Sequence, residues 1–256
     1  MNLVKAIKRK KELSAVSDAF VHKEIDAYIK RHPKVVLSNP RSKEFKAAVK
    51  DIRSRLRKVY GLFRGSSKVL KNLSQEEQII VEILNSHSST RERLPYYKEL
   101  YTKIFNLTGK PKKLLDIGCG VNPFSLQFME CKPEYYAYDL SKEEIGAVNK
   151  YFSLVKVKGR ASVKDVLTIK RFPIVDVAFI WKMTDMFDLK KGHKKTEEVL
   201  TKIKAKHLVV SFATQTMSGK QMNVPRRPWF ERMCKRLNWQ FTILEFPNEL
   251  FYIVEC

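Results

Sequence analysis

The residues best suited to chemistry lie near the middle of the chain, in the segment Leu114-Leu115-Asp116-Ile117-Gly118-Cys119-Gly120. Its apolar start predicts a buried strand, and Gly118 and Gly120 allow a sharp turn at which the backbone can approach a ligand closely. Asp139 follows Gly118 by 21 residues, at the end of the next predicted strand. A carboxylate there can accept hydrogen bonds from both hydroxyls of a ribose, so this spacing indicates a nucleoside-binding site.

Two classes of cofactor use this layout, the nicotinamide dinucleotides and S-adenosylmethionine. A dinucleotide site needs a third glycine three residues after the second, and Pro123 occupies that position. Asp116, inside the first strand, instead suits a ligand that carries an ammonium group and no phosphate. We therefore expect S-adenosylmethionine as the cofactor. Further candidates to line its pocket are Leu140, Asp165 near the adenine amino group, Val166 against the adenine ring, and Trp181.

The elements that must position these residues follow from the change in hydrophobic period after Gly109. Strands alternate with helices from there to the C-terminus, which predicts a mostly parallel α/β sheet with helices on both faces. The glycine motif in such a sheet indicates the Rossmann-like fold of class I methyltransferases. A helix is expected after Gly120, and Ser141 is expected to open another. The predicted strands cover residues 113–117, 135–138, 163–167, 174–181, 207–212, 241–246 and 249–255, and the last two can pair antiparallel.

The N-terminal third has a different character, with two predicted helices after a helical start. Apolar residues recur at helical spacing over residues 43–60, and residues 74–84 form a second helix with a capping start. A further helix, capped by Ser89 or Thr90, is expected to reach Phe105. We divide the chain into a basic, all-helical extension, residues 1–85, and a cofactor-binding domain, residues 86–256.

Charge is concentrated in that extension. The chain carries a net charge of +23, and residues 1–72 hold 20 Lys and Arg against 6 Asp and Glu. Such a charge attracts polyanions. On charge alone, the partner can be ribosomal RNA, tRNA, DNA or an anionic membrane. Four cations form a stripe on the helix predicted over residues 43–60, and we interpret them as RNA-binding: Lys46, Lys50, Arg53 and Arg57.

Other classes of protein fit the sequence poorly. The four cysteines and five histidines show no metal-ligand spacing, so we expect no metal, no disulfides and a reduced, cytoplasmic setting. No run reaches the length of a membrane span, and no apolar segment typical of a signal peptide is present near the N-terminus. Without an apolar heptad pattern, a monomer is expected.

Longer motifs carry a resemblance to one family. They are Ser89-Thr-Arg-Glu-Arg-Leu-Pro95, residues 116–123, residues 176–182, Val210-Ser-Phe-Ala-Thr214, Trp229-Phe-Glu231 and Asn248-Glu-Leu-Phe-Tyr252. From about Val21 to the C-terminus the chain resembles the aminoglycoside-resistance methyltransferases that act at N7 of guanine 1405 in 16S ribosomal RNA. The resemblance implies methyl transfer from S-adenosylmethionine within the 30S subunit, which blocks aminoglycoside binding, and an N-terminal extension that docks on that subunit.

The resemblance also implies roles for single residues. An arginine of the pair Arg91 and Arg93 meets the carboxylate of the methyl donor. Lys182 and Glu249 lie beside the target base, and Asn122 matches the asparagine of the family motif. The chain departs from the family pattern at Ala213 and Gln215, where the family has Pro and, shortly after, Arg.

Three alternatives stay open or are disfavoured at this point. A class I methyltransferase acting on another ribosomal nucleotide or on tRNA would share the donor site. An RNA-binding protein that has lost catalysis should have lost the donor acids, yet Asp116, Asp139 and Asp165 are present. A DNA methyltransferase is disfavoured because neither a Pro-Pro-Tyr-type nor a Pro-Cys-type catalytic string occurs.

Overall fold

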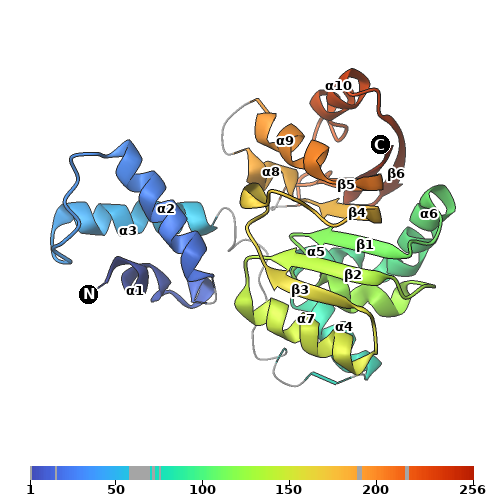
Figure 1. The fold of residues 1–256 in the computed structure, drawn as a ribbon, viewed down its shortest axis with the longest axis horizontal. Coiled ribbons are helices and arrows are strands. Elements are labelled where there is room, and N and C mark those ends of the chain that lie inside the picture. The colour runs from blue at the N-terminus through green and yellow to red at the C-terminus, as the bar shows by residue number, and fades with distance from the viewer. Residues whose placement is uncertain are drawn as a thin grey trace.

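The computed structural model describes residues 2–14, 16–57, 70, 73–74, 76–188, 192–216 and 219–256. Seven strands form one sheet in the order β3-β2-β1-β4-β5-β7-β6 (Figure 1). They are β1 (Lys113–Ile117), β2 (Glu134–Asp139), β3 (Gly159–Val163), β4 (Val175–Trp181), β5 (Ala205–Ala213), β6 (Gln240–Phe246) and β7 (Glu249–Glu255).

Five strands are parallel, and β7 pairs antiparallel with both β5 and β6. The strand order reverses beside β1, since the chain runs outward through β2 and β3 and then returns to β4. Ligands of open α/β sheets bind at such a reversal, outside the carboxyl ends of the strands. The sheet thus places the ends of β1, β2 and β4, with Asp116, Asp139 and Trp181, around one crevice.

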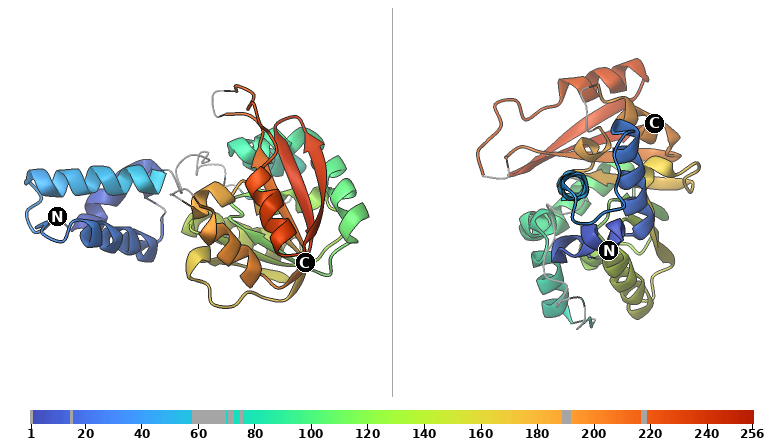
Figure 2. Two further views of the ribbon diagram at one scale, coloured as in Figure 1. Left: turned by 90° about the horizontal axis from the view of Figure 1, so that it is seen from above. Right: turned by 90° about the vertical axis from the view of Figure 1, so that its left-hand side faces the viewer.

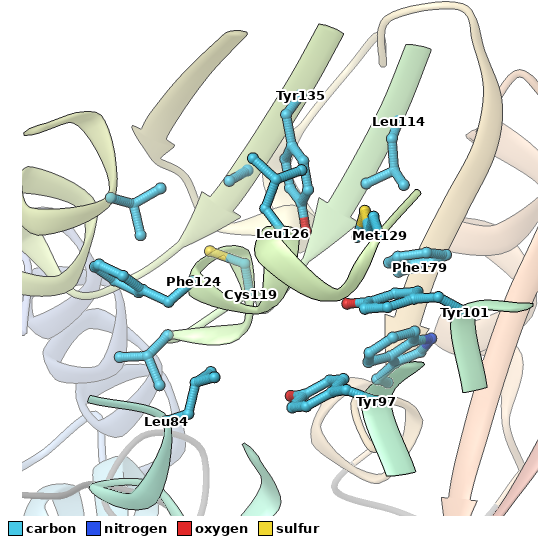
Figure 3. Close-up of a cluster of buried hydrophobic side chains, with 14 of the residues drawn as sticks. Leu84, Tyr97, Tyr101, Leu114, Cys119, Phe124, Leu126, Met129, Tyr135 and Phe179 are labelled. Atoms are coloured by element: carbon cyan, nitrogen blue, oxygen red, sulfur yellow. The ribbon is translucent and has the colours of Figure 1, made fainter. Parts of the chain in front are cut away.

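Each strand contributes side chains to both faces of the sheet, with the period of two that a strand imposes. Leu114 belongs to the apolar cluster on one face and Leu115 to the cluster on the other. Figure 3 shows the first cluster, in which the ring of Tyr101 stacks on Phe179 and on Tyr97. Both faces are buried, which explains the nearly continuous apolar run of β4.

The helices divide between these two faces. One face is covered by α4 (Glu77–Asn85), α5 (Ser88–Arg93), α6 (Tyr97–Thr108), the 3₁₀ helix Asn122–Phe128 and α7 (Lys142–Leu154). The other carries α8 (Thr184–Phe187), α9 (Lys194–Lys202) and α10 (Pro228–Arg236). Because Ile80, Ile83 and Leu84 of α4 lie in the core of the sheet, the contacts of α4 favour an earlier boundary than the predicted one between residues 85 and 86. That boundary stays a prediction.

Three further helices form a separate group at one end of the molecule (Figures 1 and 2). We call α1 (Leu3–Lys8), α2 (Asp18–Arg31) and α3 (Lys43–Leu56) the N-terminal module. The module has its own apolar core, to which Ile7, Val21 and Ile52 contribute, and which the partly buried Leu140 of the sheet domain joins. The basic, helical character predicted for this part of the chain is confirmed.

Several local predictions need correction. The helix expected over residues 43–60 is described only as far as Arg57, and residues 58–60 lie outside the described part. The helix predicted from Ser74 begins at Glu77, and Ser74 accepts a hydrogen bond from the Glu76 N–H instead of opening the helix. The third strand ends at Val163 rather than starting there.

Two predicted helices also have a different form. The segment after Gly120 is a 3₁₀ helix instead of an α-helix. The helix expected to reach Phe105 is broken into α5, a 3₁₀ turn and α6, since Pro95 lacks the N–H that a continuous helix needs. Thr90 does not cap it: its hydroxyl donates to the carbonyls of Leu84 and His87. Within the described residues, no helix is long and apolar enough to cross a membrane.

Candidate active site

A cavity of about 540 Å³ lies at the carboxyl ends of β1, β2 and β4. It gathers most of the residues that the sequence indicated. Those lining it are Arg93, Asp116, Gly118, Gly120, Asn122, Asp139, Leu140, Asp165, Val166, Trp181 and Lys182. Arg91 is exposed and Glu249 is fully buried, and neither lines the cavity.

The glycine turn forms the floor of the cavity. Gly118 and Gly120 have φ values of 66° and 48°, which L side chains rarely adopt. A Cβ on Gly118 would overlap the sulfur of Met183. The turn is held by the Tyr138 carbonyl, which accepts from the Gly118 N–H at 2.8 Å, and by the Asp139 carboxylate, which accepts from the Gly120 N–H at 2.9 Å. Glycine is therefore favoured at both positions for conformation, and at Gly118 a side chain would also have to displace the end of Met183.

Asp116 is buried at the end of β1. One of its oxygens accepts hydrogen bonds from the Asn122 amide and the Tyr135 hydroxyl, each at 2.8 Å. The Tyr97 hydroxyl donates in turn to Asn122 at 2.9 Å. Burial raises the pKa of Asp116 to about 6, against the lowering effect of these hydrogen bonds. Asn122 thus orients a carboxylate in the wall of the cavity.

The two other acids are anchored by backbone N–H groups. Asp139 accepts from the Ser141 N–H at 2.9 Å in addition to Gly120. Asp165 accepts from the Leu167 N–H at 3.0 Å, so it caps a 3₁₀ helix as well as lining the cavity. Both carboxylates are held in fixed positions at the strand ends, where a nucleoside can reach them.

A sealed ion-pair network lies on the other side of the cavity. Arg93 donates two hydrogen bonds to Glu249, from Nε at 2.9 Å and from Nη2 at 2.7 Å, and the two side chains are 3% and 0% exposed. Ser211 also donates to Glu249. Burial alone would raise the pKa of Glu249, but Arg93 and Lys182 hold it below its usual value. The arginine also stacks on Trp181, with its guanidinium carbon 4.7 Å from the ring centre.

Lys182 connects this network to the cavity. It follows β4 with a φ of 53°, a strained conformation for a residue other than glycine. Its Nζ lies 2.6 Å from Glu92 and 3.5 Å from Glu249. Two carboxylates therefore hold the ammonium at the edge of the cavity. Strain of this kind clusters at functional sites, which supports a role for Lys182 in function.

Glu249 does not line the cavity, and its predicted place beside the target base stays a prediction. Its carboxylate is sealed beneath Arg93 and Lys182, so the geometry favours a residue that positions these two cations. Glu92, which shares Lys182, was missed by sequence reasoning. It lies within the Ser-Thr-Arg-Glu-Arg-Leu motif, but nothing in the sequence marks it as a partner of a lysine 90 residues away.

A buried histidine also contacts the glycine turn. His87 lines the cavity, and its Nε2 lies 3.1 Å from Glu144, with both side chains almost fully buried. Its ring is also the nearest group that a Cβ on Gly120 would meet, at 3.5 Å. His87 therefore packs against the glycine turn.

The predicted RNA-binding cations do lie together. Lys46, Lys50, Arg53 and Arg57 line a groove of about 490 Å³ between α1 and α3, which Arg9 and Lys10 extend. Two of them are engaged within the module. Arg53 donates to the carbonyls of Ala6 and Ile7 at the end of α1, and Arg57 donates to Glu12. Lys46 and Lys50 have no ion pair among the described residues, so their charge is the most available to a partner.

Comparison with known proteins identifies the family of this chain. A family model described as ribosomal RNA methyltransferase (FmrO) matches residues 40–253. The chain is 28% identical over 234 residues to a protein named 16S rRNA (guanine(1405)-N(7))-methyltransferase from Proteus mirabilis, covering 80% of this chain and 83% of that protein. A protein of the same name from Micromonospora rosea is 27% identical over 225 residues, covering 81% of this chain and 82% of that protein.

Solved structures show the same fold. The 16S rRNA methyltransferase RmtF in complex with S-adenosyl-L-homocysteine superimposes with a TM-score of 0.81 at 24% identity, covering 99% of this chain and 96% of that chain. The 16S rRNA methylase RmtB gives a TM-score of 0.79 at 21% identity, covering 100% and 98%. Given the extent of the family match, this chain belongs to the FmrO family of ribosomal RNA methyltransferases.

Proposed function

We propose that this chain methylates N7 of guanine 1405 of 16S ribosomal RNA within the 30S subunit and so blocks aminoglycoside binding. The observation that carries the proposal is the cavity, at the carboxyl ends of the parallel strands. It is lined by the strained Lys182 and by three acids, Asp116, Asp139 and Asp165. The names of the relatives supply the nucleotide. S-adenosylmethionine, as cofactor, supplies an activated methyl group.

The residues present suit this cofactor. Asp139 is proposed to accept from ribose hydroxyls, and Asp165 from the adenine amino group, with Leu140 and Val166 as apolar neighbours. Arg93 rather than Arg91 is proposed to meet the carboxylate, because of these two only Arg93 lines the cavity. The glycine turn lines the cavity, and it offers no phosphate-binding helix because the following segment is a 3₁₀ helix.

The chemistry at the target needs few groups from the protein. Guanine N7 carries a lone pair and no proton, so attack on the methyl group is an in-line displacement without a general base. Alignment of the two reactants is then the main contribution of the protein. Lys182, held by Glu92 and Glu249, is proposed to position the guanine or its phosphate once the base leaves its stack.

Docking on the ribosome is proposed to use the groove of the N-terminal module. Its cations can neutralise phosphates along an RNA backbone, and such contacts fix orientation without reading sequence. A surface of this kind is suited to the shape of an assembled particle. We further propose that the protein acts as a monomer in the cytoplasm, where its ribosomal substrate is found.

The substrate class is tested with labelled S-adenosylmethionine and three RNAs: unmodified bacterial 30S subunits, protein-free 16S RNA and tRNA. Label in 30S alone is the expected result, because a docking groove without base readout requires the folded particle. Label in tRNA would replace the proposal by that of a tRNA methyltransferase. An Asp139→Ala variant, which loses the proposed ribose acceptor, is the matched control and should transfer no label.

A further inference from the structure

Helix α2 of the N-terminal module reaches into the cavity of the sheet domain. Phe20, Lys23, Glu24 and Ala27 line the cavity next to the residues of the strand ends. The contact is anchored close by, where the Ser17 N–H donates to the carbonyl of Leu140 at 3.3 Å. The module that carries the basic groove thus also forms part of the proposed donor site.

An ion pair crosses between the two parts of the molecule at this point. Lys23 donates to Oδ2 of Asp165, the acid proposed to accept from the adenine amino group. The other oxygen, Oδ1, already accepts from the Leu167 N–H. An adenine amino group that binds Asp165 therefore meets a carboxylate whose remaining oxygen is held by Lys23. The lysine side chain is 40% exposed, so it can leave this position without crossing a packed core.

The neighbouring residue supplies a second, independent observation. Glu24 also lines the cavity, and its Oε2 is buried without a hydrogen-bond partner among the described residues. A buried acceptor left unpaired is costly, and a ligand that brings an N–H or O–H group would remove that cost. Helix α2 therefore presents one group that competes with a bound nucleoside for Asp165 and one that the nucleoside can satisfy.

We propose that α2 completes the adenosine end of the donor site, with the donor taking Asp165 from Lys23 and donating a hydrogen bond to Glu24. The proposal rests on the proposed function, since it assumes that the cavity binds S-adenosylmethionine. Displacement releases the ammonium of Lys23 on the same module that carries the basic groove. The free cation is then available to an RNA phosphate, so donor binding and rRNA binding strengthen each other by the same factor.

Calorimetry with S-adenosylhomocysteine tests the first step on the full chain. This ligand lacks the sulfonium charge, so the loss of the Lys23 charge has little long-range electrostatic effect on its binding. A change in affinity then reports on the competition for Asp165. Lys23→Ala is expected to tighten binding about three- to fivefold, which is the scale of a partly exposed ion pair. Glu24→Gln is expected to weaken binding by a similar factor. Lys30→Ala, an exposed position two turns along α2, should leave the affinity unchanged.

Binding to 30S subunits tests the second step. For the wild type, saturating S-adenosylhomocysteine should tighten 30S binding and steepen its dependence on salt by about one phosphate contact. In Lys23→Ala, S-adenosylhomocysteine should change neither the affinity for 30S subunits nor its salt dependence. Thermal melting of each variant checks that the module stays folded.

The outcomes separate this proposal from the function on which it rests. Weaker or unchanged binding of S-adenosylhomocysteine by Lys23→Ala overturns the displacement, even if the wild type methylates 30S subunits normally. A wild type that binds no S-adenosylhomocysteine overturns the proposed function itself. Equal effects of the ligand on 30S binding by wild type and Lys23→Ala would refute the linkage alone.

Discussion

The two ends of the cavity hold their charges in opposite ways. At the proposed adenosine end, Lys23 and Asp165 pair across two parts of the molecule, with side chains 40% and 14% exposed. At the other end, Arg93 and Glu249 pair within one domain and are 3% and 0% exposed. A partly exposed pair is worth little and can be exchanged, whereas a buried pair is costly to break. The difference suggests that one end is built to open and the other to stay fixed.

Glu249→Ala is the strongest test of the fixed end. It leaves the guanidinium of Arg93 buried without its carboxylate, which costs about 3–5 kcal/mol of stability. Lys23→Ala, at the exchangeable end, should cost less than about 1 kcal/mol. Denaturant unfolding of both variants measures the contrast, and equal losses would contradict it.

Lys182→Ala tests whether the fixed end serves the target or the donor. Loss of one positioned cation is expected to lower kcat by roughly 10²–10³-fold. Affinity for S-adenosylhomocysteine should stay within about twofold of wild type, since Lys182 is proposed to face the guanine. A parallel loss of that affinity would assign Lys182 to the donor. Glu92→Gln, which keeps Lys182 but weakens its hold, should give a smaller loss of kcat.

A third carboxylate of the cavity, Asp116, leads to a prediction about the pH dependence of ligand affinity. Burial raises the pKa of Asp116 to about 6, while Arg93 opposes and Asp139 adds to the shift. The ammonium of the donor needs the ionised form, so affinity for S-adenosylhomocysteine should fall about tenfold for each pH unit below 6. Asp116→Asn should bind weakly at every pH and lose this dependence.

The sign of the effect on folding is opposite. A raised carboxyl pKa contributes stability that is present in full below the ordinary pKa and is lost as the pH rises through about 6. Weaker binding at pH 5 therefore cannot come from unfolding driven by Asp116. Calorimetry and thermal melting at pH 7.5 and pH 5 separate the two effects.

The smallest expected effects concern the basic groove. Lys50→Ala should weaken 30S binding and lower its salt dependence by about one contact, because no ion pair of Lys50 is found among the described residues. Arg53 instead holds the end of α1 through the carbonyls of Ala6 and Ile7. Arg53→Ala should thus lower the melting temperature of the module as well. Thermal melting of both variants would contradict this division if the two melting temperatures fell alike.

Much of the fold and of the proposed donor site could be predicted from local sequence patterns. The apolar runs and the glycine turn placed β1, β2 and β4 correctly, and Asp116, Asp139 and Asp165 meet at one cavity because parallel strands end at the same edge. Boundaries were less secure where the signal was a single residue. Ser74 and Thr90 looked like caps, but their hydroxyls bond elsewhere.

The partners of the charged residues could not be predicted. Glu249 and Arg93 are 156 residues apart, and Lys23 and Asp165 are 142 apart. Such pairs depend on how distant segments of the chain pack in three dimensions, which no local spacing encodes. For the same reason the sequence identified Glu249 as a functional residue but missed its burial, and it gave no sign that α2 reaches the cavity.

The proposed function is tested most directly by mapping the position of the transferred methyl group. 30S subunits treated with the protein and S-adenosylmethionine are cleaved by borohydride and aniline, which break the chain at N7-methylguanine, and the break is mapped by primer extension. Methylation at the proposed position gives a stop at guanine 1405 with wild type and none with Asp139→Ala. Methylated subunits without that stop would contradict it and direct attention to residues 213–228, where the chain departs from the family pattern at Ala213 and Gln215.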